Sequence, residues 1–198
     1  MKILRGILLV FFLTTPAFAQ HRVSSYERMA NFGVVYGTQW TVYLATQRPA
    51  IEKHGSLKNW ISYPTSPHFD NDSFDYNIFQ HSLSGASYFL FYRARGYTKV
   101  DAFLWSFVSS LAFEFTIETV TERPSWQDIY QTPVYGTLLG LGVEKVSDKL
   151  YETNTWWGKT LGTIVNPFRL LKKLDPELEG VTWTDGKSGG FYVSRSFE

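Results

Sequence analysis

Between Asn77 and Glu144 the sequence sets single ionisable side chains inside apolar stretches that have helical spacing. Burying a charge costs folding free energy unless the charge is paired or hydrogen-bonded. A chain with this pattern must therefore either complete a satisfied polar core or assemble a site that uses the charges. The side chains concerned are His81, Arg95, Glu114, Glu118 and Asp128.

Four stretches of low charge predict the helices of the fold. They span residues 29–47, 77–95, 99–120 and 125 to about 151. Pro49 and Gly96 are the expected terminators of the first two, and Ser125 is the expected N-cap of the fourth. The β-branched and aromatic content of the first stretch would also suit a strand. The sequence predicts a mainly α protein, a compact bundle of about four to five helices with a short C-terminal strand.

The remaining segments are read from turn residues and amphipathic spacing. Residues 54–75 are rich in Gly, Ser, Pro, Asn and Asp, which predicts a loop within one domain. After Trp156 and Trp157, an amphipathic stretch is interrupted by Pro167 and ends in Lys172 and Lys173. This stretch is either an ordinary terminal helix or a helix that lies on an anionic membrane surface. The last ten residues alternate as a single strand would.

The N-terminus predicts export from the cytoplasm. Lys2 and Arg5 precede an apolar run, and Pro16 is followed by the tripeptide Ala-Phe-Ala that ends at Ala19. This order is typical of a secretory signal peptide over residues 1–19, which leaves residues 20–198 as a single helical envelope domain. An uncleaved membrane anchor is the alternative. The chain has no Cys, so disulfides, thiolate metal sites and lipid attachment to Cys are excluded.

Net charge and aromatic content indicate which classes of binding partner to expect. A formal net charge of +1 without a clustered basic face gives no indication of nucleic-acid binding. Seven Trp and twelve Tyr favour a surface next to lipid, although a densely packed aromatic core has the same composition. We therefore expect membrane lipids or an envelope protein as partners, with the protein in the periplasm or at the outer membrane, peripheral or embedded.

The polar side chains have the residue types of two kinds of site. His81 lies on one helical stripe, and Glu114 and Glu118 share a face of the next helix, one turn apart. Imidazole and carboxylate groups suit zinc, iron or manganese, and a carboxylate beside a histidine also suits general acid and base catalysis. The sequence has no His-x-x-x-His, Glu-x-x-His or nucleophile-elbow motif that would choose between them. The metal and the cofactor are therefore left unassigned.

Each of these residues also has a structural explanation. His81 could be a core histidine bonded to a carboxylate, and Arg93, Arg95 or Arg123 could neutralise the two glutamates. Asp128 stands three residues after Ser125, the spacing of a capping box with Asp in place of Glu. In the same helix Gly136, Gly140 and Gly142 predict close approach of a neighbouring helix. The catalytic set His81, Glu114, Glu118 and Asp128 competes with these explanations.

The order of these residues resembles a family of secreted bacterial envelope proteins that is catalogued as a domain of unknown function. Its pattern is an Asn four residues before a His, a Gly four after it, an Arg, a Glu-x-x-x-Glu helix, Ser-x-x-Asp and spaced glycines. The resemblance covers about residues 69–149. Ser82 and Phe113 depart from the proline and tryptophan that the family commonly has. The matching positions are Asn77, His81, Gly85, Arg95, Glu114, Glu118, Ser125, Asp128, Gly136 and Gly140.

The resemblance implies that these positions belong to one unit, and it implies no reaction. A shorter part, a glutamate-bearing helix followed by Arg-x-Ser-x-x-Asp and Gly-x-x-x-Gly, is similar to VanZ-like membrane proteins. Three functions stay open at this point. The chain could be a membrane-associated envelope protein with an internal polar cluster, a hydrolase of an envelope lipid or glycan, or an assembly module whose glycine-rich helix and final strand dock on an outer-membrane partner.

Overall fold

A computed structural model describes residues 23–70, 73, 75, 77–174, 178–184 and 189–195 of the 198-residue chain. Side chains are described within 23–70, at 73 and 75, and over 78–171. The predicted signal peptide over residues 1–19 lies outside the described residues, as do the side chains of Asn77, Lys172 and Lys173.

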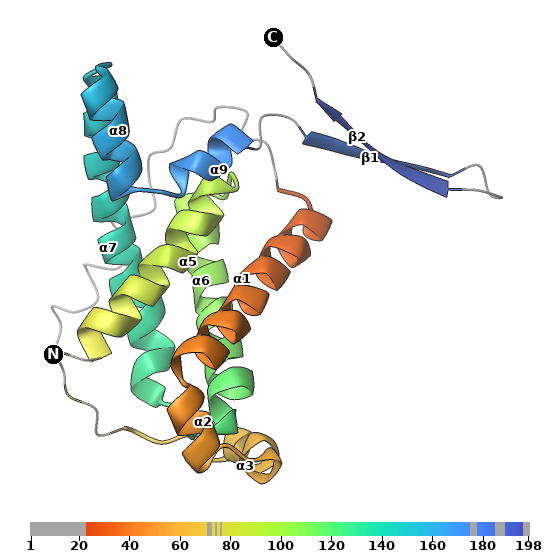
Figure 1. The fold of residues 1–198 in the computed structure, drawn as a ribbon, viewed down its shortest axis with the longest axis vertical. Helices are drawn as coiled ribbons and strands as arrows, with labels where there is room; N and C mark the ends of the chain where they lie inside the picture. Colours follow the sequence, from red (N-terminus) through yellow and green to blue (C-terminus); the bar gives the residue numbers. More distant parts are fainter. Residues whose placement is uncertain are drawn as a thin grey trace, which may run out of the picture.

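The described part is mostly helical, which confirms the predicted class (Figure 1). Five of its helices are ten residues or longer, and short helices, two single π turns and two 3₁₀ turns join them. The long helices are α1 (Ser25–Thr46), α5 (Ser82–Ala94), α6 (Lys99–Ala112), α7 (Trp126–Glu152) and α8 (Trp156–Val165). The short elements are α2 (Arg48–His54), α3 (Leu57–Ser62), η2 (Tyr63–Thr65), η3 (Asn77–His81), η4 (Phe113–Ile117), η5 (Glu118–Val120) and α9 (Arg169–Leu174).

The prediction of a plain loop over residues 54–75 is wrong in its first part, because α3 and η2 lie there. The Ser56 hydroxyl accepts a hydrogen bond from the Asn59 N–H and so caps α3. The Ser56 N–H donates to the Val120 carbonyl at the end of η5. A cap and a long-range backbone bond therefore stabilise a helix whose composition is typical of a turn.

Beyond α9 the backbone forms two strands, β1 (Leu178–Thr184) and β2 (Gly189–Arg195). They pair antiparallel, with Leu178 opposite Arg195 and Thr184 opposite Gly189. The short C-terminal strand expected from the alternating sequence stays a prediction, because residues 196–198 and the side chains of both strands lie outside the described residues.

Helices α5 and α7 run parallel and touch through glycine. A Cβ added at Gly136 would lie 2.4 Å from the Gly85 Cα, and one added at Gly140 would lie 2.6 Å from a ring carbon of Phe89. One turn further along, Arg93 Nη2 lies 2.9 Å from Glu144 Oε1. The predicted close approach is thus confirmed for Gly136 and Gly140. It is wrong for Gly142, where an added Cβ would have nothing within 4 Å.

Helix α1 runs alongside α6 in the same direction and is attached to it by single side chains (Figure 1). The Gln39 amide donates to the Ser109 carbonyl at 3.0 Å, and the Tyr43 hydroxyl lies 2.6 Å from the Thr121 hydroxyl. The buried apolar cluster lies toward the other end of α1 and comprises Val35, Phe89, Leu90, Tyr92, Tyr97 and Ala102. The Gln39 to Tyr43 part of α1 is therefore held by these polar contacts together with the Tyr43 ring, which packs against Phe113.

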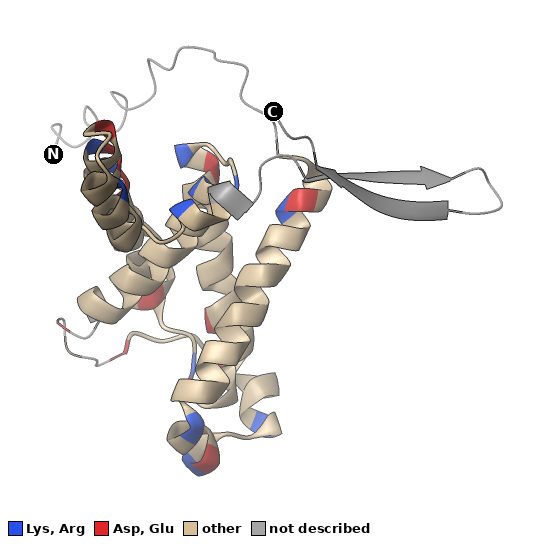
Figure 2. Ribbon diagram, turned by 45° about the horizontal axis from the view of Figure 1, so that its top comes forward, with Lys and Arg blue, Asp and Glu red and all other residues tan. Residues whose placement is uncertain are grey.

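The surface of the helices is largely uncharged along their middles. Figure 2 shows Lys, Arg, Asp and Glu gathered mainly near helix ends. Apolar side chains on several helices are exposed, including Val34 at 55%, Leu104 at 51% and Leu138 at 63%. Within the described residues, Lys99–Val120 is the one helical stretch long and apolar enough to cross a membrane. A buried core helix of a soluble protein has the same length and composition, so this observation by itself does not place the chain in a bilayer.

Candidate functional site

The two helices that carry His81 and Glu114 are both locally widened. His81 ends the π turn η3 directly before α5, and Glu114 lies in the π turn η4 that continues α6. A π turn holds one more residue than an α turn and occurs frequently at functional sites. Both turns lie at the end of the bundle where α7 begins, which brings their side chains toward Asp128.

Ser125 is the N-cap of α7, as predicted. Its hydroxyl accepts a hydrogen bond from the Asp128 N–H at 3.3 Å. The predicted reciprocal bond from the Asp128 carboxylate is not formed, because the Ser125 N–H donates to Glu114 Oε2 at 2.9 Å. Glu114, from another helix, thus occupies the position of the acidic residue in a capping box. The carboxylate of Asp128 is left to face the site.

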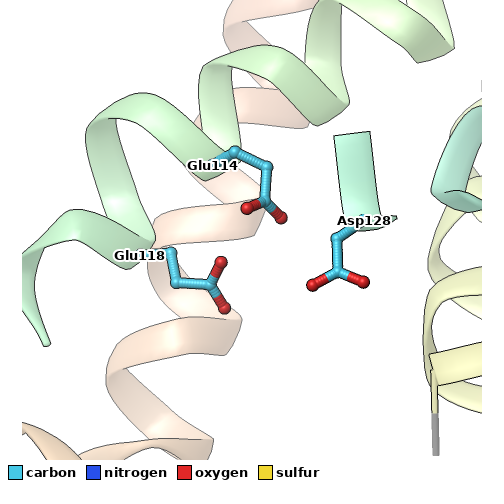
Figure 3. Close-up of side chains that lie close together, drawn as sticks. All are labelled: Glu114, Glu118 and Asp128. Atoms are coloured by element: carbon cyan, nitrogen blue, oxygen red, sulfur yellow. The ribbon is translucent and has the colours of Figure 1, made fainter. Parts of the chain in front are cut away.

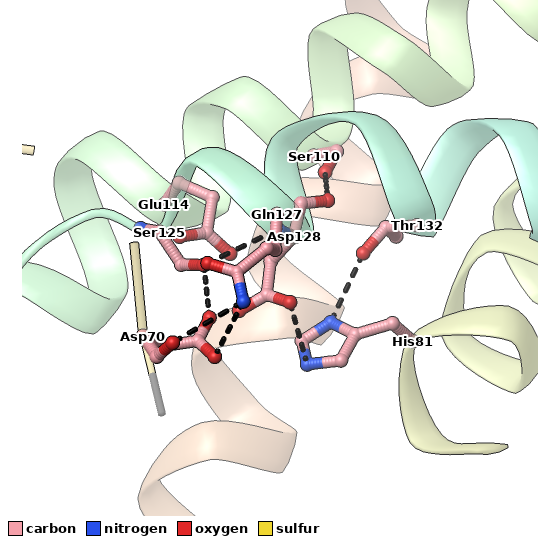
Figure 4. Close-up of polar contacts among 8 residues, drawn as sticks. All are labelled: Asp70, His81, Ser110, Glu114, Ser125, Gln127, Asp128 and Thr132. Atoms are coloured by element: carbon pink, nitrogen blue, oxygen red, sulfur yellow. Dashed lines mark hydrogen bonds and ion pairs between the residues drawn. The ribbon is translucent and has the colours of Figure 1, made fainter. Parts of the chain in front are cut away.

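His81 contacts α7 through both ring nitrogens (Figure 4). Nε2 lies 3.3 Å from Asp128 Oδ1, and Nδ1 lies 3.0 Å from Thr132 Oγ1. The neutral tautomer that protonates Nε2 lets Nδ1 accept from the Thr132 hydroxyl and sets an N–H beside the Asp128 carboxylate. With both nitrogens engaged, the arrangement favours His81 as a positioning residue for Asp128 over the role of a free base.

The three carboxylates of the predicted set converge from two helices (Figure 3). One oxygen each of Glu114, Glu118 and Asp128 lies within 4.8 Å of the others. Glu114 is 1% exposed and Asp128 is 5% exposed, whereas Glu118 is half-buried. Such a concentration of acidic groups is costly when all are ionised in a site of low polarity.

Burial and the charges of nearby carboxylates raise the pKa of both glutamates. For Glu114 the largest cause is burial, and the hydrogen bonds from Glu118 and from the Ser125 N–H act against it. For Glu118 burial again comes first, followed by the charge of Glu114. The pKa of Glu118 is therefore raised well above its usual range, and the pair shares a proton with Glu118 as the donor.

The donor set fits a divalent cation. Three carboxylate oxygens from two helices match the ligands preferred by magnesium, calcium and manganese, and they also occur in zinc sites with histidine. His81 would then orient one of the ligating carboxylates through the 3.3 Å contact of Nε2 with Asp128 Oδ1, as outer residues of metal sites do. A cation would offset the repulsion that otherwise keeps a proton on the pair.

Asp70 joins this site although no motif in the sequence points to it. One of its carboxylate oxygens accepts from the Ser125 hydroxyl, and the Gln127 amide donates to the other at 3.2 Å (Figure 4). A short parallel bridge holds the segment, in which the His68 N–H donates to the Pro124 carbonyl and His68 O accepts from the Trp126 N–H. Asp70 lies in the segment that was expected to be only a loop.

The predicted arginine does not reach the carboxylates. Arg95 Nε donates to Asn31 Oδ1 at 3.0 Å, near the opposite end of α1, and its place in the polar cluster stays a prediction. Arg93 pairs with Glu144 rather than with the glutamates. Of the three arginines considered, Arg123 is the one beside the site, where it lines the same cavity. Asn77 begins η3, and its side chain lies outside the described residues.

A cavity of about 770 Å³ opens above the three carboxylates. Its walls are one face of α1 and one face of α5, and its floor carries Glu114, Glu118 and Asp128 together with Asp70. This volume lies within the usual range of small-molecule sites, about 300–1,000 Å³. The acidic cluster is therefore accessible to a ligand.

The comparisons with known proteins identify the family. A family model described as a domain of unknown function, DUF3943, matches residues 66–168, slightly more than half of the chain. The chain belongs to the DUF3943 family. The DUF3943 region contains Asp70, His81 and the three carboxylates, whereas α1, which forms one wall of the cavity, lies before it. No curated protein and no solved structure matches the chain. The similarity to VanZ-like proteins stays a prediction.

Proposed function

We propose that this DUF3943 protein is an envelope hydrolase that acts on a membrane lipid and holds a divalent cation with Glu114, Glu118 and Asp128. The observation that carries the proposal is the convergence of these three carboxylates within 4.8 Å at the floor of a cavity of about 770 Å³. A solvated acidic patch on a surface would have no such enclosure. A metal ion in this place would polarise an ester or phosphoester group of the substrate.

The reaction adds one water across one ester bond. The bond between the carbonyl carbon or phosphorus and the bridging oxygen breaks, water supplies the hydroxyl to the acid product, and its proton ends on the alcohol product. In this scheme His81 keeps Asp128 oriented through the 3.3 Å contact, with Thr132 holding the opposite ring nitrogen. Asp70 and Ser125 fix the start of α7 and so the position of Glu114.

A lipid is favoured over a glycan because one end of the cavity is apolar. Val34, Val35, Phe91, Phe168 and Leu171 line it there. The exposed apolar side chains of the long helices further support contact between the protein and a membrane. We place the protein on the periplasmic side of the envelope, consistent with the N-terminal sequence. Carbonate extraction tests the embedded form, since release of the protein into the wash would rule it out.

The assembly alternative loses one of its supports. The glycine face of α7 was expected to dock on a partner, but α5 of the same chain covers Gly136 and Gly140. The final strand stays as the remaining support for such a partner.

Titration calorimetry of the purified protein with Mn²⁺ tests the cation site. We expect stoichiometric binding that weakens at least tenfold in Glu114→Gln and is unchanged in Glu152→Gln, an exposed carboxylate at the end of α7. Hydrolysis is then followed by product release from a lysophospholipid in the presence of Mn²⁺ and of EDTA. Equal Mn²⁺ affinity in the two variants would overturn the cation site, and hydrolysis that survives both EDTA and Glu114→Gln would overturn the metal-dependent mechanism.

A further inference from the structure

The cavity has two facing walls with helical spacing. On α5 the lining residues recur every three or four positions, at Ser84, Ser87, Tyr88 and Phe91. On α1 they form the matching stripe Val34, Val35, Thr38, Gln39, Val42, Tyr43 and Thr46. The cavity is therefore a channel parallel to both helices rather than a round pocket.

The polarity of this channel changes along its length. At the level of His81 and Tyr43 it is bordered by the carboxylates together with the apolar side chains of Val42 and Phe113, and Arg123 stands at the same end. Half-way along it is bordered by hydroxyl and amide groups, those of Thr38, Gln39, Ser84 and Ser87. Where α5 approaches α9, the side chains that border it among those the structure describes are apolar, namely Val34, Val35, Phe91, Phe168 and Leu171.

The two ends are far enough apart to hold different parts of one molecule. His81 and Phe91 are ten positions apart along nearly continuous helix, which corresponds to about 15 Å at 1.5 Å per residue. The channel has one apolar track, bounded by a single stripe on each helix. A ligand that fits it has one apolar chain and one polar head.

The charges at the polar end specify the head. Without a cation, the carboxylates there would repel an anion. With a divalent cation in place, the cation and the exposed Arg123 guanidinium together suit a phosphate, which bridges metal ions and pairs well with arginine. A neutral sugar head would form no ion pair with the cation or with Arg123.

We propose that the channel binds a single-chain amphiphile with a phosphate head. The phosphate lies at the end of Glu114, Glu118 and Arg123, and the alkyl chain lies between α1 and α5 and reaches Phe91 and Phe168. The placement of the head rests on the proposed cation site, whereas the placement of the chain rests on the channel alone. Binding of the intact amphiphile therefore depends on the cation and on an open apolar track.

Dodecyl phosphate, used below its micelle concentration, is the probe for calorimetry on the whole protein. We expect binding in saturating Mn²⁺ and at least tenfold weaker binding in EDTA. Inorganic phosphate, which has no chain, is expected to bind at least tenfold more weakly than dodecyl phosphate. Binding of dodecyltrimethylammonium in EDTA as tight as that of dodecyl phosphate in Mn²⁺ would overturn the phosphate assignment.

Ser87→Trp places a large side chain in the channel one helical turn from Phe91. Leu83→Trp is the matched control, because Leu83 is exposed on the same helix and does not line the channel. We expect Ser87→Trp to weaken dodecyl phosphate at least tenfold with unchanged Mn²⁺ affinity, and Leu83→Trp to bind as the wild type does. Val34→Trp, on the opposite wall, repeats the test if Ser87→Trp lowers the thermal midpoint.

The outcomes separate the two proposals. If the wild-type protein did not bind Mn²⁺, the proposed function would be overturned. Retained Mn²⁺ binding with equal affinity for dodecyl phosphate in the wild type and in both channel variants would overturn the amphiphile proposal and leave the cation site standing.

Discussion

Helix α5 has two faces that are built in opposite ways. Toward α7 it presents Gly85, Phe89 and Arg93, and at Gly85 the two backbones are so close that an added Cβ would lie 2.7 Å from the Thr132 carbonyl carbon. Toward α1 it presents Ser84, Ser87 and Phe91 across a cavity of about 770 Å³. One face excludes even a methyl group, and the other leaves space for a ligand.

This difference separates stability from ligand binding within one helix. Substitutions on the α7 face are expected to change the free energy of unfolding, because the two helices are packed so closely there that an added atom would overlap its neighbours. Substitutions on the α1 face are expected to change affinity for ligands and to leave stability nearly unchanged. The predictions below test this separation.

Gly136→Ala is expected to have the largest effect. Its Cβ would lie 2.4 Å from the Gly85 Cα and 2.6 Å from the Ala86 nitrogen, so backbone rather than a flexible side chain must move. We expect a loss of about 3 kcal/mol in the free energy of unfolding, measured by urea denaturation. Gly142→Ala is the control on the same helix, where open space and better helix propensity predict a gain of up to about 1 kcal/mol. Equal effects would contradict the packing argument.

Arg93→Met comes next. Arg93 and Glu144 form a pair whose side chains are only 19% and 13% exposed, so solvent does not replace the lost partner fully. We expect a loss of about 2 kcal/mol in the free energy of unfolding. The double variant with Glu144→Gln should be less destabilised than the sum of the two single variants, and strict additivity in this cycle would show that the pair is not coupled.

Glu118→Gln should act in the opposite way on the two quantities. The amide removes one acidic group from a crowded set, so the cation-free protein should be as stable as the wild type or slightly more stable. Affinity for Mn²⁺ should fall at least tenfold, which corresponds to about 1.4 kcal/mol. Thermal unfolding with and without Mn²⁺ measures both. If Glu118→Gln lowered the stability of the cation-free protein and Mn²⁺ still stabilised the variant as it does the wild type, Glu118 would be a structural residue and not a cation ligand.

Tyr43→Phe is expected to have the smallest effect. The Tyr43 hydroxyl lies 2.6 Å from the Thr121 hydroxyl and ties the last turns of α1 to the end of η5. Its loss should cost about 1 kcal/mol of the free energy of unfolding. Tyr26→Phe, at an 83% exposed position on the same helix, should leave stability unchanged. A larger loss than in Arg93→Met would mean that α1 contributes more to stability than α7 does.

The long helices were accessible to sequence reasoning because their signals are local. Gly96, which has a φ of 86°, ends the segment 77–95, the uncharged run after Asp101 indicates the segment 99–120, and Ser125 marks the start of α7. The helix α3 was missed because its stability comes from the Ser56 cap and from contact with Val120, which is distant in the sequence. Composition describes only the isolated segment.

The site was predictable in its residue types and not in its pairings. Glu114 and Glu118 share a face through spacing alone. The contact of His81 with Asp128, by contrast, requires α5 and α7 to lie parallel and close, which the fit of Gly85 against Gly136 determines. Asp70 reaches the site because a bridge between His68 and Ser125 holds its segment beside α7, and no local sequence pattern predicts this bridge. Arg95 was assigned to the cluster because helical spacing gives a side chain's direction and not its height along the bundle.

The π turn over 113–117 makes the site sensitive to chain length as well as to residue type. Removing one residue there would let the turn revert to α geometry while the helix on either side keeps its register, so the deletion would change which of residues 113–117 face the site. Glu114 would then lose its place beside the Ser125 N–H, although the other acidic side chains were still present. In a search for relatives that share this site, a single gap at this turn is therefore a stronger mark of a lost site than several substitutions around it.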